Sequence, residues 1–299
     1  MLRLAAIDIG SNAARLLISE VMRTGVSAPD FNKLNLIRIP LRLGFDVFEY
    51  KKIMPAKEEM IIQTMQAYKH LLVVYDVKHY KACATSAMRD AVNAAGILER
   101  IESETGIVVE VISGEEEAAV IYENHIAENL NRDNAYLYID VGGGSTELTL
   151  FFDNQMVFKE SFDIGTIRLL KNQVSESQWL KARDFIRERT KPFKNLVAIG
   201  TGGNINKVFS MSKKKDGKPL SLELLKDYHK ELSNVSLAQR MKLYSLREDR
   251  ADVIVPALLI FVNVMRWAEA NEIFVPKIGL ADGLIQHLYK ELMMREMEV

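Results

Sequence analysis

Short apolar runs alternate with amphipathic stretches along the first half of the chain, a pattern that indicates a mixed α/β fold. Apolar residues at helical spacing predict helices at Ala56–Val74, opened by Pro55, and at Arg89–Thr105. The strands expected around them are Leu4–Ile7, Leu16–Val21, Lys33–Leu41, Tyr80–Thr85 and Ile107–Ile112. We therefore expect one sheet with flanking helices in this half.

The second half repeats the plan. Its expected strands are Tyr136–Ile139, Glu147–Phe152, Gln155–Phe162, Leu196–Ile199 and Glu272–Val275. Ser175 and Gln178 form a capping box that opens a helix, which Pro192 stops near Lys191. Val253–Ala268 is apolar on nearly all faces and predicts a core helix. A last helix at Ala281–Met294 is placed to cross back to the first half.

Composition limits the class of protein. The 299 residues suffice for two domains, and a net charge of −1 gives no support to nucleic-acid binding. The single cysteine, Cys83, cannot form an internal disulfide and lies in a strand-like run, so we expect a buried thiol in a reducing compartment. Asp8 and Arg15 interrupt any secretory apolar segment, and no apolar run approaches bilayer length. We expect a cytoplasmic protein that does not contact membranes.

A glycine-rich hairpin is the first candidate for chemistry. Asp140 ends one strand, the triplet Gly142, Gly143 and Gly144 follows, and Ser145, Thr146 and Glu147 lead into the next strand. Glycines let backbone N–H groups approach a ligand, and a concavity of amides suits a phosphate. Asp140, with Glu147 nearby, is placed to hold a divalent cation such as Mg²⁺. The alternative is a plain glycine-rich turn whose Asp bonds its own backbone.

The N-terminus has the same arrangement. Asp8 ends a strand, and Gly10, Ser11 and Asn12 precede the next apolar run. Two such hairpins, roughly half a chain apart, predict two similar halves that face each other across a cleft. This arrangement resembles the actin-like ATPase superfamily.

Further candidates lie at element boundaries, each with a structural alternative. Gly202 and Gly203 follow a strand and open a helix, which suits an anion, although the short motif is weak evidence. Arg89 follows the hydroxyls of a strand end but could be a solvated arginine. Glu117 follows the capping box of Ser113 and Glu116 and is a candidate base, although a helix-cap role explains it as well. The basic turn at residues 213–218 is either a solvated loop or a tether for a polyanion.

An ordered set of motifs extends this picture over essentially the whole chain. The motifs are AIDIGSN (Ala6–Asn12), RLG (Arg42–Gly44), ATSAMRDAVN (Ala84–Asn93), ISGEEEA (Ile112–Ala118), IDVGGGSTEL (Ile139–Leu148), IGTGGN (Ile199–Asn204) and RADVIVPA (Arg250–Ala257). The set resembles the exopolyphosphatase/guanosine pentaphosphate phosphohydrolase (Ppx/GppA) family. ISGEEEA before IDVGGGSTE is the pairing most specific to that family.

The resemblance implies a fold and an activity. The fold is two actin-like (ribonuclease H-like) domains, each a mixed five-stranded sheet with flanking helices. We expect residues 1–124 in the first domain, with a helix at about 284–299 packing back on it, and residues 125–283 in the second. The activity is removal of the terminal phosphate of polyphosphate, or of the 5′ γ-phosphate of guanosine pentaphosphate, with Mg²⁺. A homodimer is also expected.

The resemblance also assigns roles to individual residues. Glu117 matches the water-activating glutamate, Arg89 a phosphate-contacting arginine, and Asp140 the magnesium-associated aspartate. Glu147 matches the acid of the second hairpin, with a catalytic or metal role. The metal set is Asp140, Glu147 and Asp8. The phosphate-binding set is Asp8, Gly10, Ser11, Asn12, Gly142, Gly143, Gly144, Ser145, Thr146, Gly202 and Gly203.

The chain departs from the family pattern at three places. Ala13 stands where many members have a serine, Ala281 stands where they have an arginine, and longer members continue into a helical HD-type domain. Highly processive handling of long polyphosphate is therefore not expected. Two other classes remain open: an actin-like ATPase or small-molecule kinase, and a non-catalytic module that binds polyphosphate or guanosine tetraphosphate.

Overall fold

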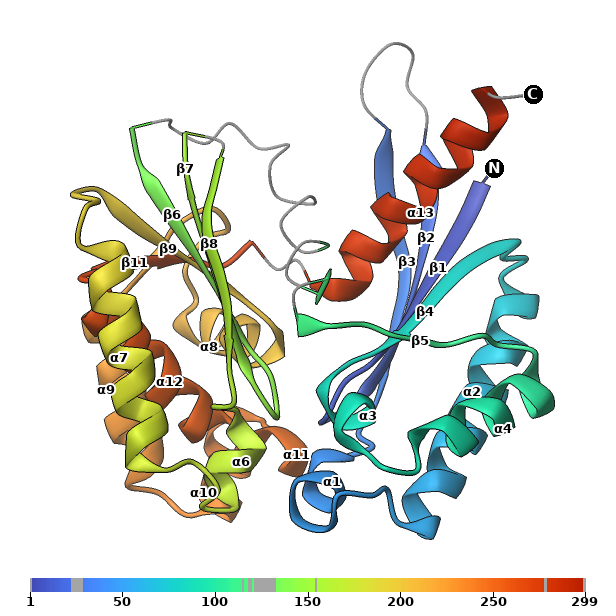
Figure 1. Cartoon of the computed structure of the whole chain (residues 1–299), viewed down its shortest axis with the longest axis horizontal. Helices are drawn as coiled ribbons and strands as arrows, with labels where there is room; N and C mark the ends of the chain where they lie inside the picture. The colour runs from blue at the N-terminus through green and yellow to red at the C-terminus, as the bar shows by residue number, and fades with distance from the viewer. Residues whose placement is uncertain are drawn as a thin grey trace. The chain divides into compact units, whose positions relative to one another are not determined.

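The chain folds into two compact units, Met1–His125 with Leu280–Val299, and Ile126–Gly279. The computed structural model describes residues 2–22, 29–114, 116–117, 120, 133–153, 155–276 and 279–297. The predicted domain boundary at residues 124–125 lies outside these ranges. Each unit is built around its own mixed sheet (Figure 1).

Unit 1 contains a five-stranded sheet in the order β3-β2-β1-β4-β5. Its strands are β1 (Leu2–Ile9), β2 (Ala14–Met22), β3 (Asp30–Ile39), β4 (His79–Ala84) and β5 (Glu110–Val111). The first three form an antiparallel meander, and β4 lies parallel to β1. Leu4 to Ile7 are fully buried, so both faces of β1 are covered.

The helices of unit 1 are α1 (Gly44–Tyr50), α2 (Pro55–Val74), α3 (Ser86–Asp90), α4 (Ala94–Thr105) and α13 (Leu280–Met297). Helix α13, although last in sequence, packs on the sheet of this unit through Leu284, Ile285 and Leu288, which join a core with Leu4 and Leu17 (Figure 1). The chain end therefore completes the core of the first unit.

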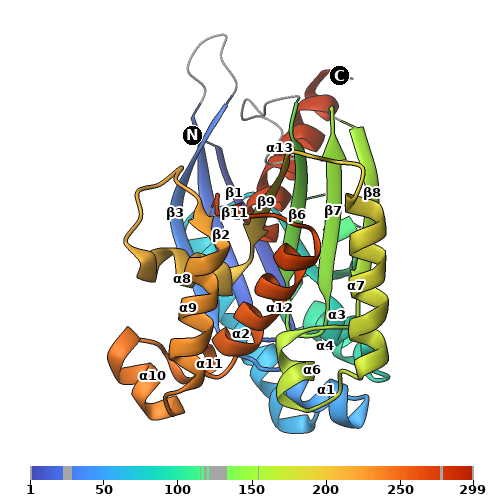
Figure 2. The same ribbon diagram turned by 90° about the vertical axis from the view of Figure 1, so that its left-hand side faces the viewer.

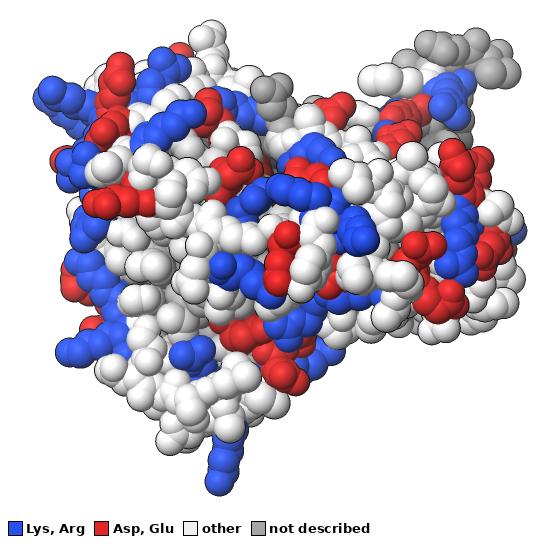
Figure 3. All heavy atoms as spheres, turned by 60° about the horizontal axis from the view of Figure 1, so that its bottom comes forward, with Lys and Arg blue, Asp and Glu red and all other residues white. Residues whose placement is uncertain are grey.

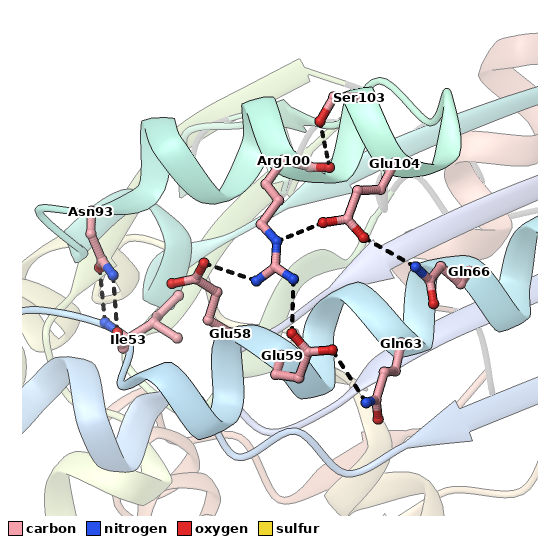
Figure 4. A network of polar contacts seen from close by, with 9 residues as sticks. All are labelled: Ile53, Glu58, Glu59, Gln63, Gln66, Asn93, Arg100, Ser103 and Glu104. Carbon is pink, nitrogen blue, oxygen red and sulfur yellow. Dashed lines mark hydrogen bonds and ion pairs between the residues drawn. The ribbon is translucent and has the colours of Figure 1, made fainter.

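Helices α2 and α4 are joined by a polar network centred on Arg100 (Figure 4). The guanidinium of Arg100 donates to Glu58 at 3.2 Å, to Glu59 at 2.8 Å and to Glu104 at 2.6 Å. Two of the carboxylates belong to α2 and one to α4, so a single arginine crosslinks the two helices.

Two expectations for this unit were wrong. The helix expected over Arg89–Thr105 is broken into α3 and α4, because the residues between them form hydrogen bonds with a distant part of the chain. The side-chain amide of Asn93 bonds both the N–H and the carbonyl of Ile53, each at 2.9 Å, and Val92 donates to Lys51 at 2.8 Å. The strand expected over Ile107–Ile112 is only Glu110–Val111, since it pairs with just the last two residues of β4.

Unit 2 contains a six-stranded sheet in the order β10-β11-β9-β6-β7-β8. Its strands are β6 (Ala135–Val141), β7 (Thr146–Phe152), β8 (Gln155–Phe162), β9 (Leu196–Thr201), β10 (Leu220–Ser221) and β11 (Glu272–Phe274). The first three form an antiparallel meander, and β9 lies parallel to β6. The expected fold class is confirmed, with a sixth short strand where five were expected.

The helices of unit 2 are α6 (Thr166–Leu170), α7 (Glu176–Thr190), α8 (Gly203–Ser212), α9 (Leu222–Ser233), α10 (Leu237–Tyr244), α11 (Glu248–Ala251) and α12 (Ile254–Trp267). Helix α12 is the expected core helix: it contacts β6 of the sheet and lies between α9 and α7 in Figure 2. The capping box of Ser175 and Gln178 is present at the start of α7. The basic turn at residues 213–218 is exposed.

Basic and acidic side chains are interspersed on the face shown in Figure 3, in keeping with the net charge of −1. Among the described helices, none combines the length and the apolar character needed to cross a bilayer.

Candidate functional site

The glycine triplet of unit 2 is held from behind by the segment that opens α6. The carbonyl of Gly142 accepts from the N–H of Thr166 at 3.0 Å, and the carbonyl of Gly143 accepts from the N–H of Ile167 at 2.9 Å. The carbonyl of Gly144 accepts from Nε of Arg168 at 2.7 Å. All three carbonyls are therefore occupied on the α6 side.

This bracing leaves the amides of the triplet available to a ligand. Within the described residues, the N–H groups of Gly143 and Gly144 donate to no acceptor. Two successive amides of this kind form an anion-binding concavity. Gly165 makes the close approach possible, because a Cβ at that position would lie 2.4 Å from the carbonyl oxygen of Gly143.

A row of oxygen-bearing side chains crosses the sheet beside the triplet. In register, Thr201 of β9 is next to Asp140 of β6, Asp140 is next to Glu147 of β7, and Glu147 is next to Ser161 of β8. Register partners point to the same face of a sheet, so the four side chains share one face. Glu147 is 5% exposed and its Oε1 accepts from Ser145 at 2.5 Å and from Ser161 at 3.2 Å.

The donor set fits a divalent cation. Adjacent carboxylates on neighbouring strands repel each other unless a positive charge compensates them, and hard cations prefer oxygen ligands. The hydroxyl of Thr201, 2% exposed, has no hydrogen-bond partner in the described structure. No group of three or more acidic, histidine or cysteine side chains that could hold a metal occurs among the described residues. Asp140 and Glu147 would therefore share a cation with water and phosphate oxygens.

An arginine to which the sequence analysis gave no role lies at the start of α8. A Cβ at Gly203 would lie 2.4 Å from a guanidinium nitrogen of Arg250, so Arg250 of α11 packs directly on the first residue of α8. The neighbouring Gly202 lies against Asp140, with 2.9 Å between its would-be Cβ and Oδ1. The glycines expected to bind phosphate are thus beside both the carboxylate row and an arginine.

The first loop of unit 1 is also fixed by backbone bonds. The N–H of Arg42 donates to the carbonyl of Asn12, and that of Gly44 to the carbonyl of Ser11, both at 2.9 Å. The hydroxyls of Ser11 and Ser86 are 2.6 Å apart and buried. The RLG motif thereby acts as a support for the loop, and α3 contributes a second hydroxyl to it.

The carboxylate of Asp8 is paired with a positively charged side chain. It is ion-paired with Arg15, the residue opposite Asp8 on β2, and is almost fully buried. The predicted metal role of Asp8 stays a prediction.

Arg89 is bonded to Ile112, which directly precedes the capping box before Glu117. One guanidinium N–H of Arg89 donates to the carbonyl of Ile112 at 2.8 Å, while the side chain is otherwise exposed. The expected capping box is present: Ser113 N–H donates to Glu116 at 2.7 Å, and Glu116 N–H donates to Ser113 Oγ at 3.1 Å. The box uses Glu116, so the carboxylate of Glu117 is not needed for it.

The thiol of Cys83 is affected by the charges of both Asp8 and Glu117. Burial, followed by the charges of Asp8 and Glu117, raises the pKa of Cys83 well above its ordinary value. Both carboxylates therefore act on the same buried thiol, which is the register partner of Asp8. The burial confirms the expected buried thiol, and a raised pKa is typical of a structural cysteine.

Comparison with known proteins agrees with these features. A sequence profile of the Ppx/GppA phosphatase family matches residues 31–292. A bifunctional 3-dehydroquinate synthase/phosphatase of Fusobacterium nucleatum is 29% identical over 91% of this chain, which spans 44% of that protein. Exopolyphosphatase 2 of Mycobacterium tuberculosis is 27% identical over 94% of this chain and 97% of its own length.

A solved structure shows the same fold. The crystal structure of an exopolyphosphatase from Cytophaga hutchinsonii superposes with a TM-score of 0.84. The alignment covers 97% of this chain and 98% of that one, at 24% sequence identity.

Proposed function

The chain belongs to the Ppx/GppA phosphatase family, and we propose that it hydrolyses the terminal phosphoanhydride bond of inorganic polyphosphate, the 5′ γ-phosphate bond of guanosine pentaphosphate, or both. The enzyme class is hydrolase. The observation that carries the proposal is the pair of amides at Gly143 and Gly144 beside the carboxylates of Asp140 and Glu147. Together they suit a phosphate accompanied by a divalent cation, for which we propose Mg²⁺.

We assign Glu117 the role of general base. Its carboxylate would orient a water molecule and accept its proton as the water attacks the terminal phosphorus in line with the leaving phosphate. The proton then resides on Glu117, and the P–O bond to the remaining chain breaks with its electron pair on the leaving oxygen. The supporting observation is that the capping box is complete without this carboxylate.

Each unit offers groups of its own that would stabilise charge on phosphoryl oxygens. The amides of Gly143 and Gly144 and the remaining N–H groups of Arg89 are preorganised donors, since their supports are fixed before substrate arrives. A bound cation held by Asp140 and Glu147 would supply positive charge next to these oxygens. The hydroxyls of Ser11 and Ser86 offer further donors.

One assay separates this proposal from the two other classes. Phosphate release is measured side by side from polyphosphate, guanosine pentaphosphate and ATP, each with Mg²⁺. We expect release from polyphosphate or guanosine pentaphosphate at a rate well above that from ATP. Preferential ATP turnover would identify an ATPase or kinase, and tight polyphosphate binding without phosphate release would identify a binding module.

A further inference from the structure

Gly283, in the first turn of α13, is in backbone contact with the helical segment that contains Glu117. A Cβ built at Gly283 would lie 2.3 Å from the carbonyl oxygen of Val120 and 2.5 Å from its Cγ1. Side chains cannot occupy such distances, and a backbone oxygen cannot rotate away. Any residue larger than glycine must therefore displace α13 or the segment at Val120.

Helix α13 is anchored on the sheet of unit 1. Leu280, Ala281 and Leu284 are buried in a core with Leu4 and Cys83 of the sheet. The carboxylate of Asp282 also forms an ion pair of 2.5 Å with Lys33 of β3. A substitution at Gly283 would consequently move the segment at Val120 rather than α13.

A displacement at Val120 would reach Glu117. Glu117 and Val120 are both in helical conformation and three positions apart, a spacing that is typical of neighbouring positions on one helix face. At its start this segment is held by the capping box of Ser113 and Glu116. Glu117 thus lies between two fixed points, the capping box and the contact with Gly283.

We propose that Gly283 is a positioning residue for the general base: the absence of a side chain there sets how closely the Glu117 segment approaches the sheet. The inference rests on the proposed role of Glu117. It gives α13 a function beyond core packing, because this helix then fixes the position of the carboxylate that activates water.

The test compares Gly283→Ala with Gly96→Ala. Gly96 lies in α4, where a Cβ would meet no atom within 4 Å, so it is a matched control. With tripolyphosphate as substrate, we expect kcat of Gly283→Ala to fall about tenfold or more, since small misplacements of a catalytic group are costly. KM should change by less than about twofold. Gly96→Ala should leave both constants unchanged and the melting temperature equal or slightly higher.

A double variant distinguishes positioning of Glu117 from a general structural effect. If Gly283 acts through Glu117, adding Gly283→Ala to Glu117→Gln should lower the residual kcat no further. A further loss equal to that in the wild-type background would overturn the inference while leaving the proposed base intact. Wild-type activity of Glu117→Gln alone would instead overturn the proposed role of Glu117 as base, and this inference with it.

Cys83 reports whether α13 stays in place. It is the only cysteine of the chain and lies in the core that α13 covers, so a thiol reagent should react slowly in the wild type and in Gly283→Ala. If Cys83 becomes reactive in Gly283→Ala, the test uses Val120→Ile in place of Gly283→Ala. The larger side chain of isoleucine presses on the same contact from the other side. The same double-variant comparison then decides: loss of kcat that disappears in the Glu117→Gln background supports the inference, and unchanged kcat overturns it.

Discussion

Asp140 and Glu147 lie directly opposite each other on the hydrogen-bonded strands β6 and β7. Two carboxylates in this relation are unfavourable without a compensating charge, and the glycine triplet between the strands offers amide donors rather than cations. We propose that the pair shares a divalent cation that accompanies the phosphate.

The first prediction concerns this pair. Asp140→Asn and Glu147→Gln should each raise the Mg²⁺ concentration required for half-maximal activity, because each removes a charged oxygen ligand. The matched control is Glu160→Gln, since Glu160 is on β8 next to Ser161 and points to the opposite face. Metal titrations of phosphate release provide the measurement. An unchanged Mg²⁺ dependence in both folded variants would remove the pair from the metal site.

The second prediction concerns Arg168, whose Nε bonds the carbonyl of Gly144. Arg168→Ala should release the triplet from its brace and lower kcat/KM about ten- to a hundredfold, the range expected for a hydrogen bond from a charged donor. Arg168→Lys should give an intermediate loss, because a lysine cannot reproduce the guanidinium geometry.

Two controls accompany this prediction. Added guanidinium should partly restore the activity of Arg168→Ala but not that of Glu117→Gln. Arg183→Ala, which removes an arginine of α7 that donates to the adjacent Asp184, should have no effect. Full activity of Arg168→Ala would show that the triplet holds its conformation without the brace.

The third prediction concerns the stability of unit 1. Hydrogen bonding from Arg100 lowers the pKa of Glu59. A carboxylate with a depressed pKa in the folded state contributes stability above its unfolded pKa, and this contribution is lost as the pH falls through the folded value. Arg100→Met should therefore lower the melting temperature at neutral pH, and the difference from wild type should vanish in acid.

Salt provides a second check on the same variant. The side chains in the Arg100 network are partly exposed, so about 1 M NaCl should screen most of the difference. A difference in melting temperature that persists in both acid and high salt would mean that Arg100 acts through packing of its aliphatic part.

Local features of the fold were predictable from the sequence. The hairpin of β6 and β7 is defined by two apolar runs and a glycine triplet within seventeen residues, and the capping boxes at Ser113 and Ser175 are local patterns as well. In contrast, the break between α3 and α4 depends on Asn93 bonding to Ile53, forty residues earlier. Helical periodicity carries no information about such a partner.

The same limit applies to the candidate site. Thr201 joins the carboxylate row only because β9 pairs with β6, which places it beside Asp140, sixty-one positions earlier in the chain. Arg250 reaches α8, and Arg168 reaches the triplet, through contacts that no short motif predicts. The sequence indicated which residue types are needed for phosphate chemistry, whereas the residues that hold them in place became visible only in the folded chain.

The central claim is that Glu117 activates water, and Glu117→Gln tests it most directly. Glutamine keeps the size of the side chain but cannot accept the proton, so kcat for phosphate release should fall about a hundredfold or more while substrate still binds. Glu116→Gln is the adjacent control, because it alters only the capping box and should retain kcat with slightly reduced stability. If Glu117→Gln keeps its kcat and only KM rises, Glu117 is not the base.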